Sequence, residues 1–290
     1  MAHGSQDRSR LALRIAMTLA LYAPHLGLLQ AQSVPKIGDL SVTPTAVLFD
    51  GRTRTQEIWL RNTGKDSALY RLSLLHLRMT EQGSLEEVPT FPASAAAMLR
   101  FSPRQITIGP GESQLVRVQL RRPENLPDGD YHVHLLFRAV PPEEEVTKPA
   151  TEELKSVQVQ FIAIPGVSIP IIVRQGASKL NLVLENAQIT GDENRMFQVT
   201  LIQNGKFGLR GTLRLLAAKH GSKTETEIAS AKVFHYGDLP RQTLQMPIPA
   251  TDLKQDLKYQ AVLQDENNTQ VASIEINNTH TKAQHGRVRN

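Results

Sequence analysis

Short runs of branched and other apolar residues alternate with turn residues along most of the chain, and no stretch keeps an apolar period of about 3.6 residues for long. This pattern predicts β-strands joined by tight turns such as Asp50-Gly51. In the first half of the chain, strands are expected at residues 39–42, 46–49, 55–62, 68–79, 105–108, 113–120, 131–139 and 156–173.

The same pattern returns in the second half, after a polar stretch at residues 174–178 where the domain break is placed. Strands are expected there at residues 180–184, 196–203, 211–218, 227–234, 241–246, 257–264 and 270–276. The sequence therefore predicts an all-β fold class, with two immunoglobulin-like β-sandwich domains at residues 32–174 and 175–279.

Two segments of the first half depart from the strand pattern. Residues 93–99 are rich in alanine and are expected to form a helical turn or a loose connection. Residues 141–155 hold three consecutive acids and three prolines, so a mobile, exposed loop is expected there.

Residues 1–31 have the three-part pattern of a signal peptide. A basic lead precedes a largely apolar run at 15–29, and small or tolerated residues follow at Leu29-Gln30-Ala31. A membrane-spanning helix is the weaker interpretation because Pro24-His25 interrupts the apolar run. We expect export, with a mature chain that starts close to Gln32 and has no stable membrane insertion.

The formal net charge of +5 comes from the two ends of the chain. The leader carries three arginines against one aspartate, and residues 280–290, interpreted as a disordered basic tail, carry three more cations. Because the chain between them has no net charge, no nucleic-acid partner is expected. The chain has no cysteine, which excludes a cysteine nucleophile and a thiolate metal site.

Motifs for catalysis are absent from the sequence: there is no phosphate loop, dinucleotide fingerprint, His-Glu-x-x-His pair or nucleophile elbow. We therefore expect no enzyme activity and no cofactor. His132 and His134, two apart on an expected strand, face the same side and could share a metal ion, which would suit a metal-dependent hydrolase. Two ligands make an incomplete site, so no metal is predicted, and the alternative is an ordinary exposed strand face.

Four stretches of the first domain together match a known family: residues 42–51 (VTPTAVLFDG), 101–104 (FSPR) leading into 109–113 (GPGES), 126–131 (LPDGDY) and 137–142 (FRAVPP). Through them the domain resembles the PapD-like periplasmic chaperones of pilus and fimbrial assembly. The resemblance covers about residues 39–174, and the second domain resembles the family only in size and β content.

The resemblance implies donor-strand complementation, in which strand G of the first domain completes the sandwich of a pilus subunit. Strand G must then alternate, and Val157, Val159, Phe161 and Ala163 share one face. This face could fill the pockets of a client subunit, or it could pack in the domain's own core. The pattern fits both equally.

The family grips the client's carboxyl end with an arginine and a lysine, whose positions here correspond to Thr45 or Ala46 and to Pro170. None of these carries a charge, so either another nearby cation, with Arg52 and Arg54 as the candidates, anchors the carboxylate, or a divergent member of the family holds its clients differently. Pro170 also lacks a backbone donor and should not lie inside a fully paired sheet.

The resemblance also implies an ion pair between Asp130 and Arg174 that helps to fix the angle between the domains. The alternative is two exposed surface charges.

The implied function is that of a periplasmic chaperone that binds and caps fimbrial or surface-structure subunits, with an outer-membrane usher as a further candidate partner. The rival is a structural or adhesive immunoglobulin-like module that stays in a surface assembly. The two differ in how long the chain stays bound to its partner, because a chaperone leaves its partner before assembly ends.

Overall fold

The computed structural model describes residues 40–141, 166–177, 179–191, 194–219, 221–222, 224–249 and 257–276. The predicted signal peptide at 1–31, most of the predicted loop at 141–155 and the predicted tail at 280–290 lie outside the described residues.

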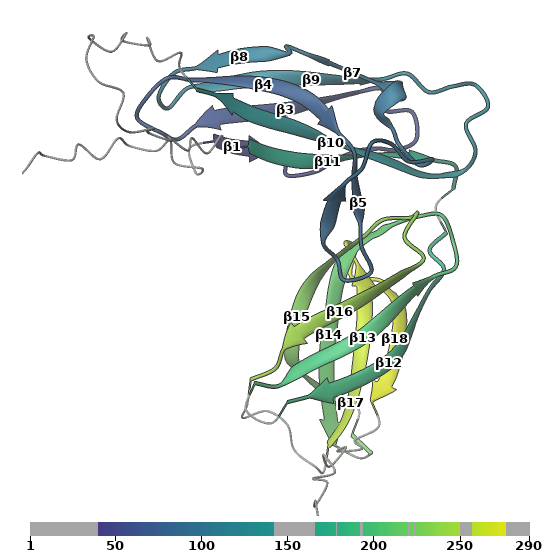
Figure 1. Cartoon of the computed structure of the whole chain (residues 1–290). Helices are drawn as coiled ribbons and strands as arrows, with labels where there is room; N and C mark the ends of the chain where they lie inside the picture. Colours follow the sequence, from purple (N-terminus) through teal and green to yellow (C-terminus); the bar gives the residue numbers. More distant parts are fainter. Residues whose placement is uncertain are drawn as a thin grey trace, which may run out of the picture. The chain divides into compact units, whose positions relative to one another are not determined.

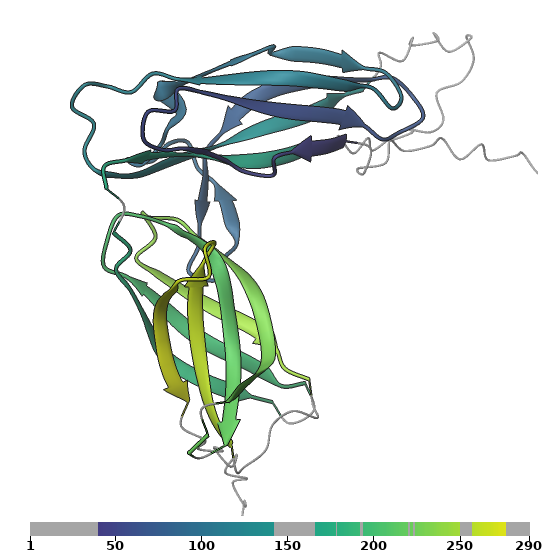
Figure 2. The ribbon, with the colours of Figure 1, turned by 180° about the vertical axis from the view of Figure 1, so that it is seen from behind.

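The first sandwich contains two main sheets and a separate hairpin. One sheet has the order β1-β3-β9-β7, the other has the order β2-β11-β10-β4-β8, and β5 pairs with β6. The strands are β1 (Leu40–Thr43), β2 (Val47–Phe49), β3 (Thr55–Asn62), β4 (Ala68–Leu75), β5 (Leu77–Met79), β6 (Leu85–Glu87), β7 (Leu99–Ser102), β8 (Gln105–Ile108), β9 (Ser113–Leu120), β10 (Gly129–Val140) and β11 (Gly166–Gln175). Figures 1 and 2 show these strands in purple to teal from two opposite sides.

Alternation of side chains builds the core of this sandwich. In β3, Ile58 and Leu60 are buried while Glu57 and Trp59 are exposed, as expected for a strand with one face on a core. Buried residues of both main sheets meet between the layers, and the largest are Phe49, Ile58, Leu60, Ile108, Leu135, Phe137 and Ile171.

The first two strands, β1 and β2, belong to different sheets. β1 pairs antiparallel with β3, whereas β2 pairs parallel with β11 through Val47–Phe49 opposite Ile171–Val173. Because β2 is short, it flanks only these three residues of β11.

The second sandwich also has two sheets, with the orders β12-β13-β16 and β15-β14-β17-β18. The strands are β12 (Leu182–Thr190), β13 (Met196–Gln203), β14 (Leu209–Lys219), β15 (Glu225–His235), β16 (Arg241–Pro247), β17 (Leu257–Asp265) and β18 (Gln270–Ile276), drawn in green to yellow in Figures 1 and 2. Its core is made of alternating residues of both sheets, including Phe197, Leu201, Leu213, Leu215 and Met246.

The predicted all-β fold class with two β-sandwiches is confirmed. Expected and observed bounds coincide for β3, β8, β9, β13 and β18. The predicted strand at 68–79 is divided into β4 and β5, and β6 and β7 were not predicted. All three residues of β6 are exposed, so no apolar alternation marks it. The alanine-rich segment forms a single 3-10 turn at Ala96–Met98.

Among the described residues, no helix is long and apolar enough to cross a membrane.

Candidate functional site

β11 has an open edge over its first five residues, Gly166 to Pro170. β10 pairs with β11 from Gly166 to Gln175, but β2 flanks only Ile171 to Val173 on the other side. Within the part of the chain that the structure describes, no strand pairs with that side of residues 166–170. Open strand edges expose unpaired backbone groups to which another strand can add. Pro170, which lacks a donor, lies in this open part, one residue before the pairing with β2 begins.

The inward face of β11 belongs to the domain's own core. Ile169, Ile171 and Val173 are buried there, whereas Gly166 is exposed. The predicted subunit-binding residues Val157, Val159, Phe161 and Ala163 lie outside the described residues. Each of them is an even number of residues away from Ile169, Ile171 and Val173, so all seven belong to one alternating series in the sequence.

Asp130 and Arg174 form a bidentate ion pair at the other end of the β10–β11 ladder. Arg174 Nε donates to Asp130 Oδ1 at 2.8 Å and Nη2 donates to Oδ2 at 2.7 Å. The side chain of Asp130 is only 3% exposed and that of Arg174 is 23% exposed. The hydrogen bond from Arg174 to Asp130 raises the pKa of Arg174, so the guanidinium stays charged.

The pair also binds the backbone of the second sandwich. The Gly208 N–H donates to Asp130 Oδ2 at 2.8 Å, and Arg174 Nη2 donates to the Gly208 carbonyl at 3.1 Å. Gly208 directly precedes β14, so the pair joins the end of β11 to the start of that strand. Charge-assisted bonds with this geometry hold two segments at a fixed separation.

His132 and His134 are buried, and the alternative of an exposed strand face is wrong. His132 Nε2 lies 3.1 Å from Asp238 Oδ1, and its ring stacks on Tyr236 at 3.7 Å between centroids. His134 Nε2 lies 2.7 Å from the Tyr236 hydroxyl. Each histidine therefore has its own partner in the segment between β15 and β16, which covers this face of β10.

Burial dominates the electrostatics of this cluster. Burial, together with the charge of His132, lowers the pKa of His134 to about 4, and burial raises the pKa of Tyr236. Both groups are therefore neutral at pH 7. The described residues contain no group of three or more His, Cys, Asp or Glu side chains that could hold a metal ion.

The two positions that correspond to the family's anchors, Ala46 and Pro170, lie beside each other. Ala46 precedes β2 and Pro170 precedes Ile171, the first β11 residue that pairs with β2, so the two are level in the parallel register. Arg52 and Arg54 are exposed and follow β2, beyond the end of that register at Val173. This places them at the end of the β2–β11 ladder away from the open edge.

Arg122 was not predicted as a site residue. Its guanidinium donates to the carbonyls of Gly51 at 2.7 Å, Arg174 at 3.2 Å and Phe49 at 3.3 Å. It thus ties the ends of β2 and β11 together. Only its place shortly after β9, a strand with one buried face, could have suggested a role, because its carbonyl partners are distant in sequence.

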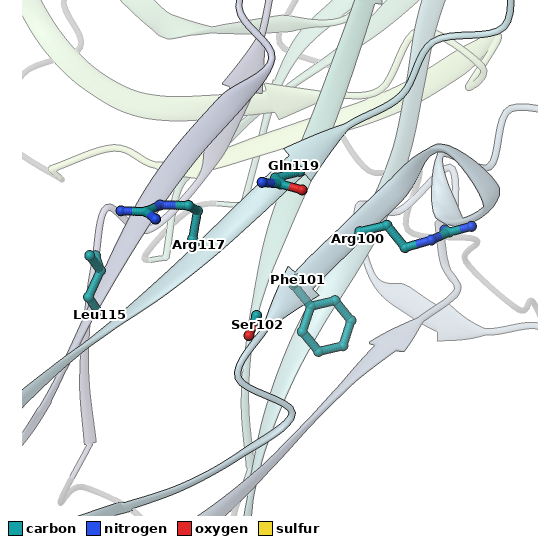
Figure 3. Close-up of a pocket in the computed structure, with 6 residues that line it drawn as sticks. All are labelled: Arg100, Phe101, Ser102, Leu115, Arg117 and Gln119. Atoms are coloured by element: carbon teal, nitrogen blue, oxygen red, sulfur yellow. The ribbon is translucent and has the colours of Figure 1, made fainter.

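A shallow cavity of about 360 Å³ lies on the other main sheet, between β7 and β9 (Figure 3). Its walls are formed by Arg100, Phe101, Ser102, Leu115, Arg117 and Gln119. Arg117 Nη2 lies 3.2 Å from Glu57 Oε1, and Arg100 Nη1 donates to the Leu99 carbonyl at 2.7 Å. Figure 3 shows the two guanidinium groups pointing away from each other, so they do not form one anion site.

Over 82% of its length, the chain is similar to several solved chaperone structures. One is the YadV chaperone, at 12% identity and a TM-score of 0.43, covering 82% of this chain and 100% of that one. Another is the Escherichia coli chaperone DraB, at 14% identity and a TM-score of 0.40, covering 82% and 97%. A third is the CsuC–CsuE chaperone–tip adhesion subunit complex of Acinetobacter baumannii, at 17% identity and a TM-score of 0.40, covering 82% and 97%. No protein-family model and no curated protein matches the chain. The assignment of two β-sandwiches rests on the strand pairing described above.

Proposed function

We propose that this chain is a divergent PapD-like periplasmic chaperone that binds and caps fimbrial or surface-structure subunits by donating its strand G. The observation that carries the proposal is the open edge of β11 at residues 166–170, which begins three residues after the alternating apolar segment at 157–163 ends. An edge supplies backbone hydrogen bonds, and alternating apolar side chains supply the contacts that fill a client's pockets.

Two further features support the proposal. The short pairing of β2 leaves residues 166–170 of β11 open, and Pro170 removes one backbone donor from this part of the strand. The motifs quoted for the resemblance lie in this same domain, and residues 137–142 (FRAVPP) span the end of β10, the strand beside β11. The chain therefore combines the family's sequence motifs with an edge suited to strand addition.

The proposed partners are those that the resemblance implies, namely pilus or fimbrial subunits and an outer-membrane usher. The proposed location is the periplasm, reached through the signal peptide at residues 1–31. The proposed role is binding without catalysis.

The test is a pull-down of periplasmic subunits with the mature wild-type protein and with Phe161→Asp. Burying a phenylalanine side chain contributes about 1.5–3 kcal/mol, so capture by Phe161→Asp should fall about 10- to 100-fold. The matched control is Gln160→Asp, which adds the same charge one residue earlier, on the other face of the alternating segment.

Circular dichroism should show that both variants are folded, and mass spectrometry should identify the captured protein as a surface-structure subunit. Equal capture by wild type and Phe161→Asp would show that this face is not the donor. A subunit that stays bound in the finished surface structure would support the structural-module alternative instead.

A further inference from the structure

Two arginines face each other on the outer side of the sheet beside the open edge. Arg138 of β10 is directly opposite Arg71 of β4 in the antiparallel register, so both side chains lie on the same face. Both are exposed, and the neighbouring Leu72–Phe137 pair faces the core on the other side. Like charges at directly opposed positions repel each other and destabilise a sheet.

No acidic side chain offsets this repulsion among the described residues. Neither arginine has an ion-pair partner there, and the positions two residues away on β4 and β10 are Leu69, Ser73, Leu136 and Val140. The other main sheet provides the contrast, because Arg117 of β9 lies opposite Glu57 of β3 and pairs with it. The Arg71–Arg138 pair therefore lacks the counter-charge that Arg117 has.

The residues that lie opposite one another across β4, β10 and β11 form a row, and the row with these arginines ends at the open edge. Arg138 is opposite Gly166 of β11, so the row runs Arg71, Arg138, Gly166 and then the unpaired side of β11. A Cβ atom at Gly166 would meet Leu136 Cδ1 at 3.2 Å, whereas glycine leaves that space open. A strand added to β11 would lie about 5 Å from Gly166 and about 10 Å from β10. A side chain on that strand can therefore extend over Gly166 toward Arg138.

We infer that Arg71 and Arg138 form a carboxylate-binding site for an aspartate or glutamate side chain of the strand that adds to the open edge of β11. This inference rests on the proposed function, and it adds that the partner strand carries a negatively charged side chain at this position. A carboxylate between the two guanidinium groups accepts charge-assisted hydrogen bonds and removes their mutual repulsion. Arginine suits this role because its planar donors match both carboxylate oxygens.

The probe is a synthetic strand peptide of alternating valine and threonine, blocked at both ends, with one central glutamate. A second peptide has glutamine at that position, and a third is the glutamine peptide with a free terminal carboxylate. Binding of each to the full mature protein is measured by isothermal titration calorimetry at low salt. We expect the glutamate peptide to bind at least about tenfold more tightly than the blocked glutamine peptide, because hydrogen bonds to charged groups contribute about 1.5–3 kcal/mol.

The variants Arg71→Gln and Arg138→Gln should each remove this preference while leaving the affinity for the glutamine peptide unchanged. Arg117→Gln is the matched control, because it removes one surface arginine from the other sheet and should keep the preference. Thermal unfolding provides a readout without any ligand. Arg71→Gln should not lower the melting temperature, since it relieves an unfavourable pair.

The outcomes separate the inference from the proposed function. Equal binding of the glutamate and glutamine peptides would overturn the carboxylate site and leave strand addition standing. Tighter binding of the third peptide alone would show that the arginines take a terminal carboxylate and not a side chain, and would overturn the assignment. Failure of all three peptides to bind would also overturn it, whereas the proposed function is decided by the subunit pull-down.

Discussion

Replacing Asp130 with alanine removes a charge from the largely buried ion pair with Arg174. The Asp130 side chain is 3% exposed and accepts two bonds from Arg174 and one from the Gly208 N–H. Without it, the guanidinium of Arg174, which is 23% exposed, and the Gly208 N–H both lose a charged acceptor. Removing one partner of a buried pair costs about 3–5 kcal/mol, so Asp130→Ala should lower the free energy of unfolding by about that amount.

The assay is urea unfolding of wild type, Asp130→Ala, Arg174→Ala and the double variant. Direct coupling predicts that the double variant loses much less stability than the two single losses added together. The control is Glu57→Ala, which breaks a pair whose side chains are 56% and 49% exposed and should cost about 0–1 kcal/mol. Hydrogen exchange adds a local readout, because the Gly208 amide should exchange faster without its acceptor.

Two results would refute this reasoning. One is a loss for Asp130→Ala no larger than that for Glu57→Ala, which would mean that burial does not strengthen the pair. The other is additivity in the double variant, which would mean that the two side chains act separately. A strong coupling together with faster exchange at Gly208 would support the proposal that the pair helps to fix the position of the second domain.

Two other perturbations test the burial of His134 and the close packing at Gly211. Burial lowers the pKa of His134 from 6.5 to about 4, so the unfolded chain binds more protons than the folded chain between these two pH values. The free energy of unfolding should therefore fall by up to about 3 kcal/mol as the pH drops from 6.5 to 4, and it should level off below pH 4. Urea unfolding of wild type and His134→Gln from pH 7 to pH 4 measures this, and an equally steep decline in both would show that His134 is not the cause. Gly211→Ala should destabilise the second sandwich by about 1–3 kcal/mol, because the added Cβ overlaps the Gln264 carbonyl oxygen in the neighbouring strand. An unchanged melting temperature would contradict this close packing.

The strands that could be predicted are those with one face on a core and one in water. β3 is an example, since Ile58 and Leu60 alternate with Glu57, Trp59 and Arg61 in the sequence as they do in the sandwich. Local periodicity suffices there because burial follows from the strand's own pattern. β6 has no such pattern, because all its residues are exposed and it pairs only with β5.

The burial of the two histidines could not be predicted from β10 alone. His132 and His134 are covered by Tyr236 and Asp238, which are about a hundred residues away in the sequence. One local indication existed, because the apolar Leu136 lies on the same face as the histidines, opposite the face of Val133, Leu135 and Phe137. Strands that are covered on both sides show that pattern, so the face with the histidines was also a candidate for burial.

The Arg71–Arg138 pair depends on strand register, which a single sequence does not specify. Neither arginine is unusual in its own strand, and the site exists only because β4 and β10 align these two positions. The bidentate pair of Asp130 and Arg174 is different, because the resemblance implied it from sequence positions before any register was known.

The charge beside the open edge also bears on which strands can add to it. An exposed strand edge is liable to pair with the same edge of a second copy. Two copies joined through β11 would place both arginine pairs on one continuous sheet face, where no described acid is available to balance them. Pro170 removes one donor from the same edge, so pairing between two copies would also have one fewer backbone bond on each side. An acidic partner strand avoids the first cost, because its carboxylate neutralises the arginines that would repel a second copy. The same two side chains therefore favour a partner of opposite charge over self-association.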